Sequence, residues 1–197
     1  MEYYLLAPGI AGGNKAEALV VAERIARIDR AQGFSTEARL AEFEKDTGKN
    51  DAGNVEALLI KAAEAAPGKY KAQMELARFE LAKEHRNPEA AEAAARAALR
   101  LDATRVDAYS ALADVYASRG RWAELDRLLD EADAAVPDDW TPHYRAAEAM
   151  LRTAENSAAA QGNLRKYLAQ EPEGNQPTAA QAREKLELAR AESARAQ

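Results

Sequence analysis

The sequence contains no cysteine among its 197 residues. Disulfide scaffolds, cysteine-ligated zinc or iron–sulfur sites and thiol nucleophiles all need this residue, so the sequence excludes them. Aromatic residues are scarce, at 6%, and histidine occurs only twice. No apolar run approaches the ~20 residues that span a bilayer, and we therefore expect no membrane span. Residues 1–6 also lack the basic and apolar regions of a signal peptide.

A basic excess is absent as well. Lys and Arg number 27 against 33 Asp and Glu, which gives a formal net charge of −6. Because nucleic-acid binding depends on a basic surface, nucleic acid is not an expected partner. What the sequence does have is alanine, which fills 49 of the 197 positions and so far exceeds its usual globular share.

The composition predicts helices along the whole chain. Ala, Leu, Glu, Arg and Lys dominate, and these residues have the lowest cost in a helix. The segments between the predicted helices contain residues that start or end helices. Asn87-Pro88, for example, predicts an N-cap followed by a first helical turn. The linkers have the lengths that join antiparallel helix pairs. The predicted helices span residues 1–6, 14–31, 35–46, 54–66, 70–85, 88–101, 105–119, 122–136, 141–154, 158–170 and 178–195.

An internal repeat decides the fold class. The phrase LAEFE at residues 40–44 recurs 36 residues later as LARFE at 76–80. It recurs more loosely as LADVY at 112–116 and as AAEAM at 146–150. Self-similarity at a fixed period of this length indicates a solenoid, in which each helix pair buries its apolar face against the next pair.

The repeat resembles the tetratricopeptide (TPR) motif. The unit that begins at Val106 fits best, with Tyr109, Leu112, Ala113, Tyr116, Gly120, Leu129, Ala132 and Pro137 at motif positions. Leu125 departs from the pattern, since a small residue is expected there.

The TPR resemblance implies an all-α fold, an α-α superhelix of about four complete helix pairs plus flanking N- and C-terminal helices. We expect a single TPR-like domain over residues 1–197. It would comprise a partial first repeat (1–33), repeats at 34–69, 70–105, 106–139 and 140–174, and a C-terminal capping helix (175–197).

The glycine-rich segment before Lys15 invites a comparison with a phosphate-binding loop. A P-loop needs Gly directly before its Lys and Ser or Thr directly after it, whereas Asn14 and Ala16 occupy those places. The segment is better interpreted as a turn that opens a helix.

The glycine-rich segment, residues 3–18, also resembles a loop in a group of bacterial, often exported, TPR proteins of unknown function. The resemblance implies that residues 1–6 end a helix whose beginning is missing, and that the chain is an excised part of a longer array. Any signal peptide would then lie upstream, in which case the protein is exported or periplasmic; otherwise the expected compartment is the cytoplasm.

The residues that commonly carry chemistry form no recognisable motif. His85 and His143 lie in different repeats, and neither has the spacing of a metal-ligand pair. No Ser-His-Asp set is apparent, and the abundant carboxylates alternate with basic residues as on a solvated helix face. We therefore predict no catalytic residue, no metal site and no cofactor.

The candidate binding residues come from the TPR resemblance, because the first helix of each TPR pair (helix A) lines a concave groove. Met74 and Tyr144 would supply apolar contacts to a groove of mixed charge, although exposed charges that merely solvate a helix are an equal alternative. Ala38 and Met74 stand where TPR domains that hold chaperone tails have Lys, so chaperone-tail binding is not predicted. The candidate groove residues are Arg39, Glu42, Lys71, Met74, Arg78, Asp114, Tyr144, Arg145, Glu148 and Arg152.

These features favour a non-enzymatic protein–protein interaction scaffold that binds a peptide or helix of a partner in the groove. A glycan- or small-molecule-binding module of the cell envelope is the alternative, but it would need aromatic platforms, and only Tyr144 qualifies. Self-association through exposed repeat ends is a further alternative, and a concentration-dependent mass would distinguish it. An enzyme has the least support.

Overall fold

The computed structural model describes residues 15–46, 52–82, 87–153, 156–174 and 176–195. Within these ranges all ten regular elements are α-helices, which confirms the predicted all-α class. The chain divides into two compact units, residues 1–79 and 80–197. The prediction of one continuous domain therefore stays a prediction. None of the described helices is both long and apolar enough to cross a bilayer.

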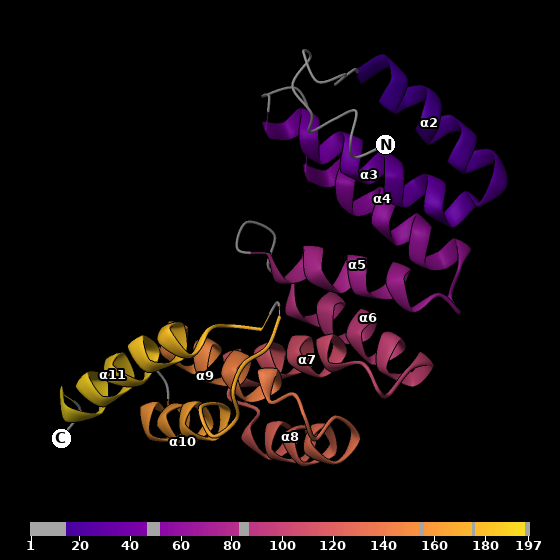
Figure 1. Ribbon diagram of the computed structural model, residues 1–197. Coiled ribbons are helices and arrows are strands. Elements are labelled where there is room, and N and C mark those ends of the chain that lie inside the picture. Colours follow the sequence, from indigo (N-terminus) through magenta and orange to yellow (C-terminus); the bar gives the residue numbers. More distant parts are fainter. Residues whose placement is uncertain (1–14, 47–51, 83–86, 154–155, 175, 196–197) are drawn as a thin grey trace. The chain divides into compact units, whose positions relative to one another are not determined.

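In the first unit, α3 and α4 pack closely as a helix pair (Figure 1). Small and branched residues make its core, because the small side chains let two helix backbones approach and the larger ones fill the space beside them. The helices are α2 (Lys15–Ile28), α3 (Arg30–Asp46), α4 (Ala52–Ala65) and α5 (Tyr70–Leu81), whose last two residues belong to the second unit. The core cluster of this unit contains Ala38, Ala41, Val55, Leu58, Leu59 and Phe79.

The turn between α2 and α3 is not where the sequence predicts it. The sequence predicts a linker at residues 32–34, around Gly33, but the break is Asp29 alone and Gly33 lies inside α3. The Asp29 carboxylate accepts a hydrogen bond from the Gln32 backbone N–H at 3.1 Å and so caps α3. Gly33 is needed for a different reason, since a Cβ there would lie 2.6 Å from the Cβ of Ala26 on α2.

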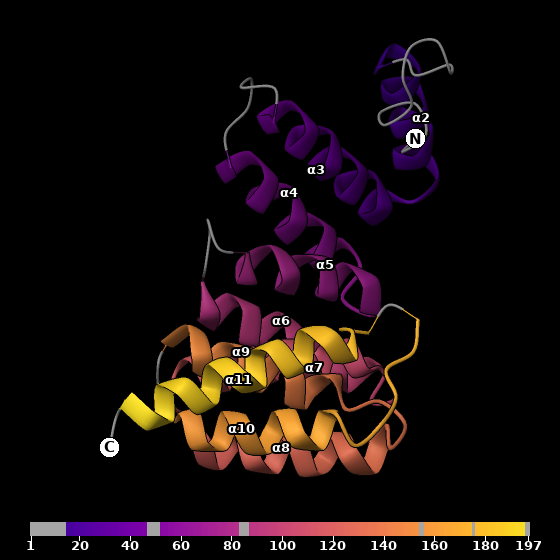
Figure 2. The same ribbon diagram turned by 60° about the vertical axis from the view of Figure 1, so that its left-hand side comes forward.

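The second unit contains the segments predicted as the repeats 106–139 and 140–174, preceded by α6 and followed by α11. Its helices are α6 (Pro88–Leu101), α7 (Val106–Ser118), α8 (Trp122–Ala135), α9 (Thr141–Thr153), α10 (Ser157–Tyr167) and α11 (Ala179–Arg195). The helices α7 and α9 pack side by side, and α8 and α10 lie on the same side of that pair (Figures 1 and 2). We therefore identify α7 and α9 as A helices and α8 and α10 as the B helices that back them.

Alanine explains the close packing of these helices. Helix α6 buries Ala91, Ala94, Ala95 and Ala98, a spacing of three or four residues that forms one stripe toward α7. Leu125, the departure from the TPR pattern, is buried as well. The core accepts a leucine at this position, so the departure does not disturb the repeat.

The capping and chain-reversal residues predicted from the sequence lie at helix ends in the structure. Asn87 accepts a hydrogen bond from the Ala90 N–H at 3.2 Å and caps α6 as expected. Gly120 and Gly174 have φ of 65° and 56°, which L side chains rarely adopt, at the expected chain reversals. The predicted helix over residues 1–6 lies outside the described residues.

Helix α11 is the last described element of the second unit. It packs mainly against α10 and also contacts α9. The Tyr167 hydroxyl at the end of α10 donates to the Pro177 carbonyl oxygen at 2.5 Å and so fixes the chain just before α11. Ala182, Leu186 and Ala189 are buried, and they form the stripe that attaches α11 to the unit.

Candidate functional site: the A-helix faces

The ten predicted groove residues lie on A helices, five in each compact unit. We call them the first A-helix face (Arg39, Glu42, Lys71, Met74 and Arg78, on α3 and α5) and the second A-helix face (Asp114, Tyr144, Arg145, Glu148 and Arg152, on α7 and α9).

The first A-helix face is held together by an ion pair between its two helices. Arg39 Nη2 lies 3.2 Å from Glu75 Oε1, and Lys71 Nζ lies 3.8 Å from the same oxygen. Glu42 and Arg78 are exposed. Met74 is only 2% exposed, so most of its side chain packs in the core.

In the second A-helix face, ion pairs join successive A helices. Arg152 Nη2 on α9 lies 2.8 Å from Asp114 Oδ1 on α7. Glu148 on α9 receives two cations, with Arg145 Nη1 at 2.7 Å and Lys185 Nζ of α11 at 3.0 Å. Burial raises the pKa of Glu148, but its hydrogen bonds with Lys185 and Arg145 outweigh this and leave the pKa below its usual range. The charged side chains of this face therefore hold α9 against α7 and α11, in addition to making the surface polar.

Tyr144 is buried, at 3% exposed, although the sequence predicts it as an apolar contact for a partner. Its ring packs against the Tyr167 ring at a centroid distance of 5.3 Å and an interplanar angle of 56°. The Arg145 guanidinium and the Lys185 ammonium lie over the ring at 5.5 and 5.8 Å. The face of the Tyr144 ring is thus covered by cations of the protein itself.

A cavity of about 470 Å³ lies between α9 and α11. Its α9 wall is Tyr144 and Glu148, both predicted from the sequence, whereas its α11 wall is not predicted, because the sequence indicates α11 only as a cap. A signal was present, since the α11 residues have the i, i+3, i+4, i+7 spacing of a single helix face. We call this cavity the α9–α11 groove; its lining residues are Tyr144, Glu148, Gln181, Glu184, Lys185 and Leu188.

No protein-family model matches this chain, and no curated protein matches it. Its fold is similar to that of MamA. The crystal structure of MamA matches with a TM-score of 0.50 at 15% sequence identity, over 89% of this chain and 86% of the MamA chain. At this identity the similarity to MamA concerns the fold alone, and it confirms the TPR-like α-α superhelix class that the repeats predict. The ten groove residues stay predicted partner contacts.

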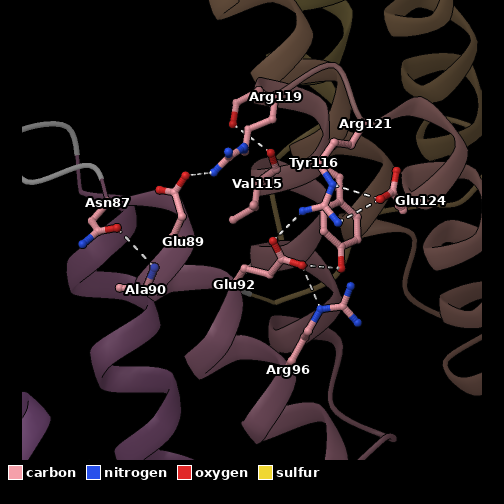
Figure 3. Close-up of polar contacts among 11 residues, drawn as sticks. Asn87, Glu89, Ala90, Glu92, Arg96, Val115, Tyr116, Arg119, Arg121 and Glu124 are labelled. Atoms are coloured by element: carbon pink, nitrogen blue, oxygen red, sulfur yellow. Dashed lines mark hydrogen bonds and ion pairs between the residues drawn. The ribbon is translucent and has the colours of Figure 1, made fainter.

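A polar network at the junction of α6, α7 and α8 was not predicted (Figure 3). The Tyr116 ring has the guanidinium carbons of Arg121 and Arg96 at 4.6 and 5.5 Å from its centroid. The Glu92 carboxylate forms ion pairs with the guanidinium groups of Arg96 at 2.9 Å and Arg121 at 2.5 Å. Arg121 also forms an ion pair with Glu124. Because Glu92 and Arg121 satisfy each other here, we assign this network to the joining of three helices and not to ligand binding.

His143 has a structural environment. Its Nε2 lies 2.9 Å from Asp133 Oδ1 and its Nδ1 lies 2.8 Å from Asn163 Oδ1, so the imidazole links α9 to α8 and α10. The Lys166 ammonium pairs with the other Asp133 oxygen. Among the described residues, no three His, Cys, Asp or Glu side chains are grouped to hold a metal ion. His85 lies outside the described residues.

Proposed function

We propose that this chain is a non-enzymatic protein-interaction scaffold that binds a peptide or a helix of a partner protein on its second A-helix face. The observation that carries the proposal is the α9–α11 groove, whose volume is about 470 Å³. Both of its walls are helix faces, and they present carboxylates, an amide and an ammonium beside Leu188. Such a mixture of a few polar groups and apolar surface suits peptide side chains.

The environment of Tyr144 weighs against the glycan-binding alternative. A sugar ring would need to stack on an open aromatic face, and Tyr144 is the one groove aromatic that the sequence offers. That ring is packed against Tyr167 and lies beneath the Arg145 and Lys185 cations. The Tyr144 ring therefore forms part of the groove wall and has no open face on which a sugar ring could stack.

The test is affinity capture followed by a direct titration. The full chain is used as bait in lysate of the source organism, captured proteins are identified by mass spectrometry, and each is purified and titrated against the chain. We expect a partner whose affinity falls at least tenfold with Arg152→Glu, about 1.4 kcal/mol. This substitution reverses a charge on the second A-helix face one helical turn from Glu148, which lines the α9–α11 groove.

The control for the charge reversal itself is Arg100→Glu. Arg100 and Arg152 both stand in the last turn of a helix, but Arg100 lies on α6, outside the second A-helix face. Both substitutions therefore place the same unfavourable charge at a helix C-terminus. Equal loss of binding in the two variants would place the binding surface elsewhere, and the absence of any titratable partner would contradict the proposal.

A further inference from the structure

The charges that line the α9–α11 groove do not balance within it. Three lining residues are charged, namely Glu148, Glu184 and Lys185. Glu148 and Lys185 form an ion pair of 3.0 Å, and the second cation on Glu148, Arg145, lies over the Tyr144 ring and not in the groove lining. Glu184 is exposed and forms no ion pair with any residue that the structure describes. Its carboxylate is the charge available to a partner.

An apolar side chain accompanies this carboxylate. Leu188 stands four residues after Glu184 on α11, lines the same groove, and is 49% exposed. Residues four apart on a helix have Cβ atoms about 5–6 Å apart on one face. The groove thus offers a carboxylate without an ion-pair partner among the described residues, one helical turn away from an exposed leucine.

The surrounding unit has the same sign of charge as Glu184. Residues 80–197 contain 21 Asp and Glu against 16 Lys and Arg. An excess of one sign attracts segments of the opposite sign and raises their rate of encounter. The charge of the unit therefore favours a basic partner segment over an acidic one.

We propose that the α9–α11 groove binds a partner helix that presents one basic side chain one turn away from an apolar side chain. The inference rests on the proposed function and specifies the partner of that site. The basic group pairs with Glu184 and the apolar side chain packs on Leu188. A helix is the matching shape, since its i, i+4 pair has the same separation as the two groups on the α11 wall.

The test selects the occupant from a library of helices. A displayed library of alanine-rich helical peptides, with two positions one turn apart randomised to all residues, is selected against the full chain. Selected peptides are then synthesised and their dissociation constants measured by fluorescence anisotropy. We expect Lys or Arg paired with Leu, Ile, Met or Phe, and an affinity that falls at least about tenfold with Glu184→Lys.

The control variant is Glu187→Lys, which makes the same charge change on the same helix. Glu187 pairs with Arg190 on the exposed surface and does not line the groove. We expect this variant to bind the selected peptides within about twofold of the parent chain, because surface ion pairs contribute little. Replacing the basic residue of a selected peptide by Glu should restore binding to the Glu184→Lys variant.

The outcomes separate the inference from the function on which it rests. Enriched peptides without a basic residue, or equal weakening by Glu184→Lys and Glu187→Lys, would overturn the inference and leave the scaffold function standing. If no peptide is enriched at all, both the inference and peptide binding at this groove fail. Circular dichroism of each variant confirms that the helices are intact.

Discussion

At the scale of the residue, two glycines show how packing decides the effect of a methyl group. Gly33 and Gly162 both lie inside helices, α3 and α10. A Cβ on Gly33 would lie 2.6 Å from the Ala26 Cβ and 2.7 Å from its Cα, whereas a Cβ on Gly162 would have nothing within 4 Å. The sequence predicts Gly33 in a linker and Gly162 inside a helix, so it did not indicate that a Cβ would meet another helix only at Gly33.

We predict opposite effects for the two alanine substitutions. Gly33→Ala should lower the free energy of unfolding by about 1–3 kcal/mol, because backbone atoms of α2 must move. Gly162→Ala should raise it by about 0.5–1 kcal/mol through helix propensity. Urea unfolding followed by circular dichroism measures both. A stabilising Gly33→Ala would show that α2 does not approach α3 as closely as described.

Asp133 gives a prediction for pH. Burial raises the pKa of Asp133, but hydrogen bonds from Lys166 and His143 outweigh it, and the pKa lies below its usual range. A carboxyl with a lowered folded pKa stabilises the fold above its unfolded pKa of about 3.9, and this contribution is lost as the pH falls through the folded pKa.

The variant that tests the role of Asp133 is Asp133→Asn. At pH 5 its free energy of unfolding should be about 1–3 kcal/mol below that of the parent chain, because a charged hydrogen-bond acceptor is lost. This difference should shrink as both proteins are moved toward pH 2. A difference that stays constant over this range would show that the Asp133 charge does not stabilise the fold.

At the scale of the element, most helices could be predicted from the sequence because caps, prolines and repeat spacing agree. The predicted helix at 88–101 coincides with α6, and that at 122–136 ends one residue beyond α8. The predicted start of α3 was wrong because a glycine needed for a close helix contact looks the same as a helix terminator.

The candidate site was predictable in part, for a related reason. The α9 wall of the groove follows from the register of the repeat, which places Tyr144 and Glu148 on one face. The α11 wall lies beyond the clear repeats, and only the structure shows that Lys185 reaches Glu148. That Tyr144 would be buried depended on Tyr167 and Lys185, which are distant in sequence, so no local pattern could indicate it.

The two faces of α11 should respond differently to the same substitution. Leu186 is 7% exposed and anchors the helix, whereas Leu188 lines the groove. Leu186→Ala should lower the free energy of unfolding by about 2–3 kcal/mol, since it removes buried apolar atoms. Leu188→Ala should change it by less than about 0.5 kcal/mol. Thermal unfolding compares the two, and equal losses would contradict this assignment of faces.

At the scale of the whole molecule, the division into two compact units can be tested with a fragment. Residues 87–197 begin at the Asn87 cap and contain α6 to α11 with their own buried core. We expect this fragment to be helical and to unfold cooperatively, because each repeat packs against its neighbours within the fragment. An unfolded fragment would show that the second unit needs residues 1–86 to fold, as expected if the chain is one continuous domain.

The TPR-like fold provides helix faces, and our central claim is that the α9–α11 groove, where the second A-helix face meets α11, binds a partner protein. Hydrogen–deuterium exchange of the chain, with and without the partner identified by capture, tests this most directly. We expect slowed exchange to be concentrated in α9 and α11, whose residues line the groove. Slowed exchange confined to α8 and α10, or no change with a partner that binds, would contradict it.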